Sequence, residues 1–206
     1  MDVVTKVCVL GGTFDPIHRG HLIVAGVVRE RLSSAEVMLV PAGQPWLKSE
    51  RAIATAADRL AMVRLAAAGQ CGLSVSTIEI ERSGPSYTVD TLRALKTVLP
   101  SGDELYFILG WDNLLDLPRW HKPEEIIRLC RLVAVPRIGS RVPEAAALEK
   151  RLPGLSGRVI LLDKPEIDIS ATVIRERVKL GLPINHLVPD AVGHYIQEHH
   201  LYRSGK

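Results

Sequence analysis

The chain has 206 residues, of which 47% are hydrophobic, so it is long enough to bury the core of one globular domain. Its formal net charge of +3 is too small for a protein that coats nucleic acid, and no apolar run approaches the roughly 18 residues of a transmembrane helix. Three widely spaced cysteines indicate reduced thiols rather than disulfides or a zinc ribbon. Together with the lack of a secretion signal at the N-terminus, they predict a cytoplasmic protein. The small charge and the short apolar runs predict no nucleic-acid or membrane partner.

Short runs of β-branched or apolar residues alternate along the chain with amphipathic patterns of helical period. In chain order, strands are expected over residues 7–10, 37–40, 73–80, 105–109, 132–135 and 159–162, with helices between most of them over 21–32, 55–68, 89–98 and 124–129. Continuous apolar strands that alternate with amphipathic helices are typical of a sheet covered on both faces. The pattern therefore predicts an α/β protein with a doubly wound, mostly parallel sheet of about six strands.

The pattern becomes purely helical after the sixth strand. Helices are expected over residues 170–180 and 189–198, the second with a proline at its start. We predict one domain over residues 1–206, with an α/β core over 1–165 and a C-terminal helical segment over 166–206. Two stretches rich in proline, glycine and charge are expected to be long irregular loops, residues 41–54 and 136–157.

The stretch GGTFDPIHRGH, residues 11–21, directly follows the first predicted strand. Gly11 and Gly12 permit a ligand to approach the backbone at the carboxyl edge of the sheet, and a helix that begins near the first histidine would turn its free amides toward the same place. His18 and His21 would share one face of that helix and donate hydrogen bonds to phosphate oxygens. The residues match neither a P-loop nor the G-x-G-x-x-G dinucleotide motif, so the pattern predicts a different kind of phosphate site.

Residues 11–21 resemble the signature of the nucleotidyltransferase superfamily that carries [T/H]-x-G-H, in the form seen in bacterial nicotinate mononucleotide adenylyltransferases. The resemblance implies a Rossmann-like fold and, in NAD biosynthesis, adenylyl transfer from ATP to nicotinate mononucleotide with release of pyrophosphate. It also implies that the nucleotide is bound by Gly11, Gly12, Thr13, Phe14, His18 and His21. A glycine turn with capping residues is the alternative, and a zinc site is a weaker one because Asp15 is the only nearby third ligand.

A second candidate phosphate element lies at residues 168–175. Ser170 is a good N-cap, so a capped amphipathic helix is one interpretation. Alternatively, the hydroxyls of Ser170 and Thr172 and the guanidinium of Arg175 would clamp a polyphosphate at the helix N-terminus. The stretch resembles the family's Ile-Ser-x-Thr-x-x-Arg element, which binds the ATP phosphates, although Ala171 stands where many members have a second serine.

Further residues of the nucleotide and acceptor sites follow from the same resemblance. Gly110 and Asp112 are similar to the family's Gly-x-Asp, which lies against the adenosine; Asp112 is expected to bind a ribose hydroxyl or, alternatively, to cap the next helix. Trp120 matches the residue that stacks on the pyridine ring. Thr88 matches a residue at the start of the family helix that binds the pyridine carboxylate. The alternative role of Thr88 is also that of a helix cap.

Two cations complete the expected acceptor site. Lys48 lies in the loop over residues 41–54, which resembles the family's mobile loop, although Trp46 and Leu47 stand where Pro-His is common. Arg137 follows the fifth predicted strand and is expected to meet the mononucleotide phosphate, with a solvated surface arginine as the alternative. Lys48 is also expected to act in catalysis.

The proposed chemistry needs no general base, because the attacking phosphate monoester, with a second pKa of about 6, is mostly anionic at pH 7. Catalysis would consist of aligning the attacking phosphate with the α-phosphorus of ATP and stabilising the negative charge that grows on the phosphate oxygens. The residues expected to do this are His18, His21, Lys48, Ser170 and Arg175. Magnesium is expected on the ATP phosphates, with no metal site made by the protein alone. The alternatives are another acceptor such as nicotinamide mononucleotide, a noncatalytic nucleotide-binding regulator, and a metal-dependent hydrolase. The sequence leaves the oligomeric state open, a homo-oligomer included.

Overall fold

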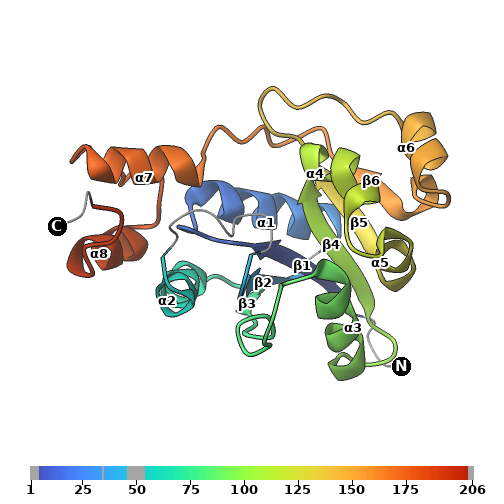
Figure 1. Ribbon diagram of the computed structural model, residues 1–206, viewed down its shortest axis with the longest axis horizontal. Helices are drawn as coiled ribbons and strands as arrows, with labels where there is room; N and C mark the ends of the chain where they lie inside the picture. Colours follow the sequence, from blue (N-terminus) through green and yellow to red (C-terminus); the bar gives the residue numbers. More distant parts are fainter. Residues whose placement is uncertain (1–4, 34, 46–53, 204–206) are drawn as a thin grey trace.

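The computed structural model describes residues 5–33, 35–45 and 54–203 (Figure 1). Within these ranges, six strands pair in parallel in the order β3-β2-β1-β4-β5-β6. They are β1 (Lys6–Gly12), β2 (Glu36–Pro41), β3 (Leu73–Val75), β4 (Glu104–Gly110), β5 (Arg131–Val135) and β6 (Val159–Leu161). The order reverses between β1 and β4, at the switch point where open α/β sheets bind ligands. The predicted fold class is confirmed.

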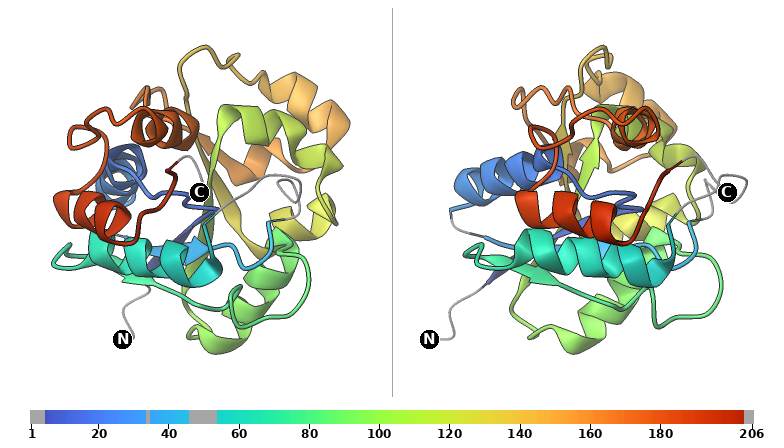
Figure 2. Two further views of the ribbon diagram at one scale, coloured as in Figure 1. Left: turned by 60° about the vertical axis from the view of Figure 1, so that its left-hand side comes forward. Right: turned by 90° about the vertical axis from the view of Figure 1, so that its left-hand side faces the viewer.

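Helices cover both faces of the sheet (Figures 1 and 2). Strand side chains alternate between the two faces: Cys8 and Leu10 of β1 belong to one buried cluster, and Val7 and Val9 to the other. The first cluster includes residues of α1 (Arg19–Arg31), α2 (Ala56–Ala67), α7 (Ala171–Lys179) and α8 (Asp190–Glu198), and the second includes residues of α3 (Thr88–Val98), α4 (Trp111–Asp116), α5 (Pro123–Leu129) and α6 (Ala145–Arg151). Short 3₁₀ turns add η2 (Leu117–Arg119) and η3 (Ser156–Arg158).

The C-terminal helices return to the side of the sheet on which the chain forms its first helix. In Figure 2, α8 lies along α2, which comes far earlier in the sequence. Val192 and Ile196 of α8 are buried in the same cluster as α1 and α2, and the Tyr195 hydroxyl donates a hydrogen bond to Asp58 Oδ1 at 3.0 Å. The helical segment therefore shares its core with the N-terminal half of the sheet.

Two sequence predictions about the elements are wrong. The third strand ends at Val75 instead of continuing to residue 80, because the Thr77 carbonyl accepts hydrogen bonds from the amides of Ile80 and Glu81 and closes a turn. Residues 136–157 are not wholly irregular, since they contain α6 and the start of η3. Leu148 and Leu152 bury this helical stretch in the core beside α5.

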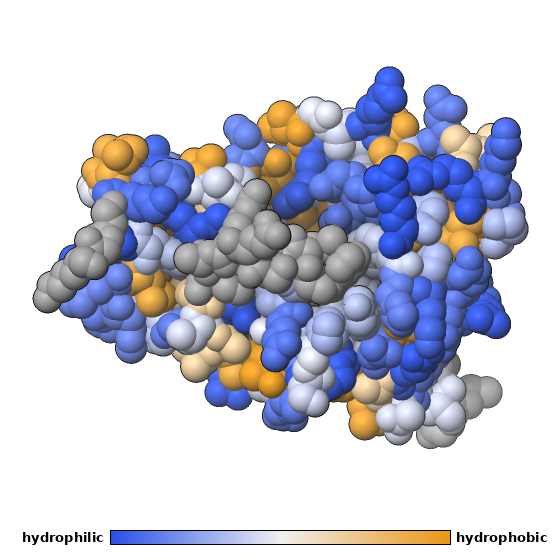
Figure 3. Space-filling model, in the orientation of Figure 1, coloured by the Kyte–Doolittle hydropathy of each residue, from blue (hydrophilic) through white to orange (hydrophobic). Residues whose placement is uncertain are grey.

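The surface is polar over most of the face drawn in Figure 3, where hydrophobic side chains form separate small groups. Many of the larger apolar side chains, such as Met62, Leu92 and Leu132, are fully buried, whereas a few, such as Leu180, are exposed. No helix in the described ranges combines the length and apolar character that crossing a membrane requires.

Candidate active site

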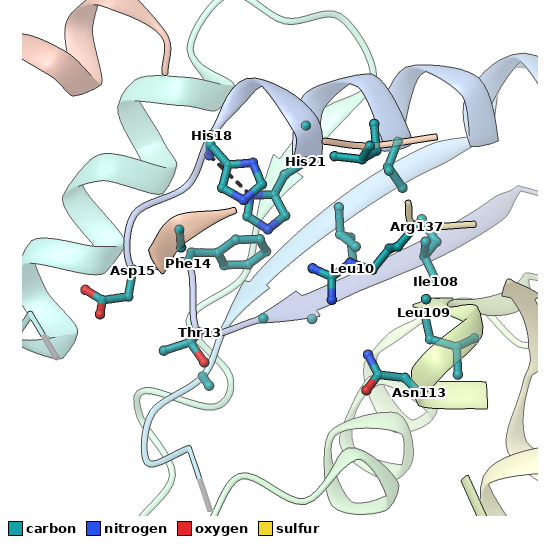
Figure 4. A pocket seen from close by; sticks show the side chains of 18 of the residues that line it. Leu10, Thr13, Phe14, Asp15, His18, His21, Ile108, Leu109, Asn113 and Arg137 are labelled. Carbon is teal, nitrogen blue, oxygen red and sulfur yellow. Dashed lines mark hydrogen bonds between the residues drawn. The ribbon is translucent and has the colours of Figure 1, made fainter. Parts of the chain in front are cut away.

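A cavity of about 520 Å³ opens at the switch point between β1 and β4 (Figure 4). Its walls come from the ends of β1 and β4, the residues after β5, and the N-termini of α1 and α7. The predicted site residues that line it are Gly11, Gly12, Thr13, Phe14, His18, His21, Thr88, Gly110, Trp120, Arg137, Ser170, Thr172 and Arg175. The fold thus brings the N-terminal motif and the late helix to one place.

The two histidines of the motif form a stacked pair at the start of α1. Their ring centroids lie 3.7 Å apart, and the His18 amide donates to Nδ1 of His21 at 3.2 Å (Figure 4). Since Nδ1 of His21 is an acceptor, the neutral ring carries its proton on Nε2. Gly20 makes the stack possible: a Cβ there would come 2.6 Å from Ile167 Cγ2 and 3.0 Å from His18 Nδ1.

His18 is a buried, neutral imidazole. Only 3% of the residue is exposed, and burial, followed by the charge of Arg137, lowers its pKa from 6.5 to about 4. Its Nδ1 has no hydrogen-bond partner among the described residues, and an unpaired buried nitrogen costs stability. The ring can therefore supply a hydrogen bond to a ligand at neutral pH, although not a positive charge.

The N-terminus of α7 forms another part of the cavity wall. Ser170 is its N-cap, with Oγ accepting from the Val173 amide at 3.2 Å, so the capped-helix interpretation is observed. Arg175 reaches back, with Nη2 donating to Thr172 Oγ1 at 3.3 Å and Nη1 donating to the Asp15 carbonyl at 2.7 Å. These contacts hold the guanidinium at the edge of the cavity.

Thr88 and Trp120 form the side of the cavity where the acceptor is expected. Thr88 is the first helical residue of α3 and Tyr87 precedes it as the N-cap, so Thr88 does not have the capping role that was its alternative. The Trp120 ring packs edge-on against Phe107, with centroids 6.1 Å apart at 82°. An aromatic side chain and a helix start with free amides therefore face the same space.

Asp112 is predicted to bind the nucleotide, but it is not among the residues that line the cavity. It is the second residue of α4, whose N-cap is Gly110, so it is not a helix cap either. Its Oδ2 lies 3.3 Å from Nη1 of Arg137, in an ion pair that is about half exposed. Arg137 does line the cavity, and Figure 4 shows its side chain pointing into it. Lys48 lies outside the described residues.

Sequence reasoning missed two charged residues that shape the cavity. Glu79 lines it, is 8% exposed and accepts a hydrogen bond from Thr91 Oγ1 at 2.6 Å, and burial raises its pKa. Arg59 is 1% exposed and donates to three loop carbonyls, at 2.8 Å to Thr13 and 3.2 Å to each of Gly43 and Ala54. No local pattern predicts these contacts, because the partners lie in other segments. The described residues include no cluster of three or more histidine, cysteine or acidic side chains able to hold a metal ion.

Known proteins resemble this chain over most of its length. The cytidylyltransferase-like family model matches residues 9–177. The chain belongs to this family. Its relatives include a probable nicotinate-nucleotide adenylyltransferase of Dehalococcoides mccartyi, 57% identical over 96% of this chain and 97% of the relative, and one of Roseiflexus sp., 47% identical over 95% and 96%. The resemblance found in the sequence is confirmed.

Solved structures support the same cytidylyltransferase-like fold at lower identity. Plasmodium falciparum nicotinic acid mononucleotide adenylyltransferase complexed with NaAD matches with a TM-score of 0.76, at 20% identity, over 96% of this chain and 97% of that one. The same enzyme complexed with APC matches with a TM-score of 0.74 over the same shares of the two chains. At this identity the likeness shows the fold.

Proposed function

We propose that this protein transfers the adenylyl group of ATP to nicotinate mononucleotide, giving nicotinate adenine dinucleotide and pyrophosphate. The observation that carries the proposal is the convergence of the His18–His21 pair and the N-terminus of α7 with Arg175 on one cavity. The names of relatives up to 58% identical support the same reaction. Two helix N-termini and a guanidinium beside a glycine-ended strand suit a triphosphate.

In the proposed reaction, a phosphate oxygen of the mononucleotide attacks the α-phosphorus of ATP. A new P–O bond forms, the bond from the α-phosphorus to the bridging oxygen breaks, and that oxygen leaves with pyrophosphate. Nε2 of His21 and the neutral ring of His18 would donate hydrogen bonds to phosphate oxygens, and Arg175 with the amides of α7 would hold the leaving group. Lys48 is proposed as a further cation that stabilises the growing charge.

Recognition of the pyridine acceptor is assigned to the other end of the cavity. Trp120 would stack on the pyridine ring, Thr88 and the first amides of α3 would bind its carboxylate, and Arg137 would meet the mononucleotide phosphate. Asp112 would bind a ribose hydroxyl of the adenosine after exchanging its present contact with Arg137. Mg²⁺ belongs to this proposal as the cation that the ATP phosphates bind, because it prefers hard oxygen ligands.

The test is pyrophosphate release from ATP and Mg²⁺ with either pyridine mononucleotide as acceptor. The proposal expects rapid release with nicotinate mononucleotide, much less with nicotinamide mononucleotide, and a dinucleotide product of matching amount. Equal rates would overturn the acid preference. ATP binding without release would identify a noncatalytic nucleotide-binding protein, and release that needs no acceptor would identify a hydrolase.

A further inference from the structure

Asp15 is a buried carboxylate at which four segments of the chain meet. It is 3% exposed and points away from the imidazole pair, toward α2 (Figure 4). Its Oδ1 accepts hydrogen bonds from the Ala54 amide at 3.1 Å and from the Tyr202 hydroxyl at 2.8 Å. Its Oδ2 lies 3.7 Å from Nη1 of Arg175 and has no hydrogen bond within the described residues.

The contacts of Asp15 fix where Arg175 lies. Nη1 of Arg175 donates to the Asp15 carbonyl at 2.7 Å, and the same guanidinium faces the Asp15 carboxylate. A buried carboxylate requires hydrogen bonds or an opposite charge. If Oδ1 lost the tyrosine donor, the carboxylate would keep the Ala54 amide and the charges of Arg59 and Arg175, and it would compete more strongly with a phosphate for the Arg175 guanidinium.

Tyr202 supplies that donor from the far end of the chain. Its backbone φ is +61° and that of His200 is +52°, so two residues without glycine's freedom adopt the left-handed conformation just where the chain turns toward Asp15. Tyr202 is not among the residues that line the cavity, and it reaches the motif from behind. Its hydroxyl bonds to Asp15, and Asp15 in turn faces Arg175, so this contact links Tyr202 to the cavity.

We propose that Tyr202 is a positioning residue for the nucleotide: its hydroxyl saturates Asp15, and this leaves the guanidinium of Arg175 free to bind the ATP phosphates. The inference rests on the proposed function only in placing the triphosphate beside Arg175. It adds a residue that neither the sequence motifs nor the cavity wall indicates.

The chain offers a matched control for the test. Tyr195 lies in the same C-terminal segment and also donates to an aspartate, Asp58 Oδ1, at 3.0 Å, but neither residue lines the cavity. Tyr202→Phe and Tyr195→Phe each remove one hydroxyl from one tyrosine–aspartate pair. Tyr202→Phe is expected to cost more stability, because Asp15 is buried and Asp58 is partly exposed, and only Tyr202→Phe should weaken binding of ATP.

Binding is measured by calorimetry with α,β-methylene-ATP and Mg²⁺, so that no acceptor and no turnover is required. We expect Tyr202→Phe to raise the Kd about tenfold, as for loss of a hydrogen bond to a charged group, and Tyr195→Phe to leave it within twofold. In an Arg175→Lys background, Tyr202→Phe should add less than twofold, because both changes act through one contact.

The outcomes separate this inference from the proposed function. A Kd of Tyr202→Phe equal to wild type, a similar rise in Tyr195→Phe, or a full tenfold effect in the Arg175→Lys background overturns the positioning role. If wild type binds the analogue but forms no dinucleotide with nicotinate mononucleotide, the proposed reaction fails and the positioning role stands. A wild-type chain that does not bind the analogue overturns both.

Discussion

The two ring nitrogens of His21 have different tasks. Nδ1 accepts the His18 amide and closes the first turn of α1, whereas Nε2 carries the proton that we assign to the ATP phosphates. His21→Asn keeps an acceptor near Nδ1 and removes Nε2. We expect kcat for dinucleotide formation to fall about 10²- to 10³-fold, as for loss of one preorganised donor, with the free energy of unfolding within about 1 kcal/mol of wild type. Turnover within a few-fold of wild type in the folded variant would contradict the role.

The buried state of His18 makes stability depend on pH. Its folded pKa of about 4 lies below the usual histidine value of 6.5, so the unfolded chain takes up a proton first as the pH falls. The contribution of His18 is complete above pH 6.5, is lost between pH 6.5 and 4, and totals about 3 kcal/mol. Urea unfolding between pH 6.5 and 4 should show that the free energy of unfolding of wild type falls as the pH falls. In His18→Asn this fall should be smaller by about 3 kcal/mol. Parallel curves for the two proteins would refute the assignment.

At the scale of one element, α1 holds two glycines with opposite requirements. A Cβ on Gly20 would meet Ile167 and His18, whereas a Cβ on Gly26 would meet nothing within 4 Å. We expect Gly26→Ala to stabilise the protein by about 0.5 to 1 kcal/mol, because alanine favours a helix interior. Gly20→Ala should destabilise it by about 1 to 3 kcal/mol and weaken binding of the ATP analogue, since the imidazole stack must shift. Thermal unfolding and calorimetry on both variants check this; a stabilised Gly20→Ala would show that the helix start has room.

At the scale of the whole molecule, the sequence predicts what is encoded locally. The apolar strands, the helix that starts after His18 and the cap at Ser170 depend on neighbouring residues, and apart from the shorter third strand the structure has them where the pattern indicates. The contact of Arg59 with Thr13 and that of Tyr202 with Asp15 could not be predicted, because these partners lie 46 and 187 residues away in the chain. α6 was missed since its proline- and glycine-containing surroundings outweighed a short alanine-rich run.

The convergence of both ends of the chain also predicts how a nucleotide stabilises the protein. Because the cavity walls come from the start of α1 and the start of α7, a bound triphosphate would link two segments about 150 residues apart. Saturation with α,β-methylene-ATP and Mg²⁺ should slow amide hydrogen exchange at residues 18–21 and 171–175 together, while residues 145–151 of α6, which do not line the cavity, serve as the internal control. The two protected segments should respond with the same dependence on ligand concentration, since one molecule contacts both. Protection of only one segment, or two different midpoints, would mean that the imidazole pair and Arg175 do not bind the same triphosphate.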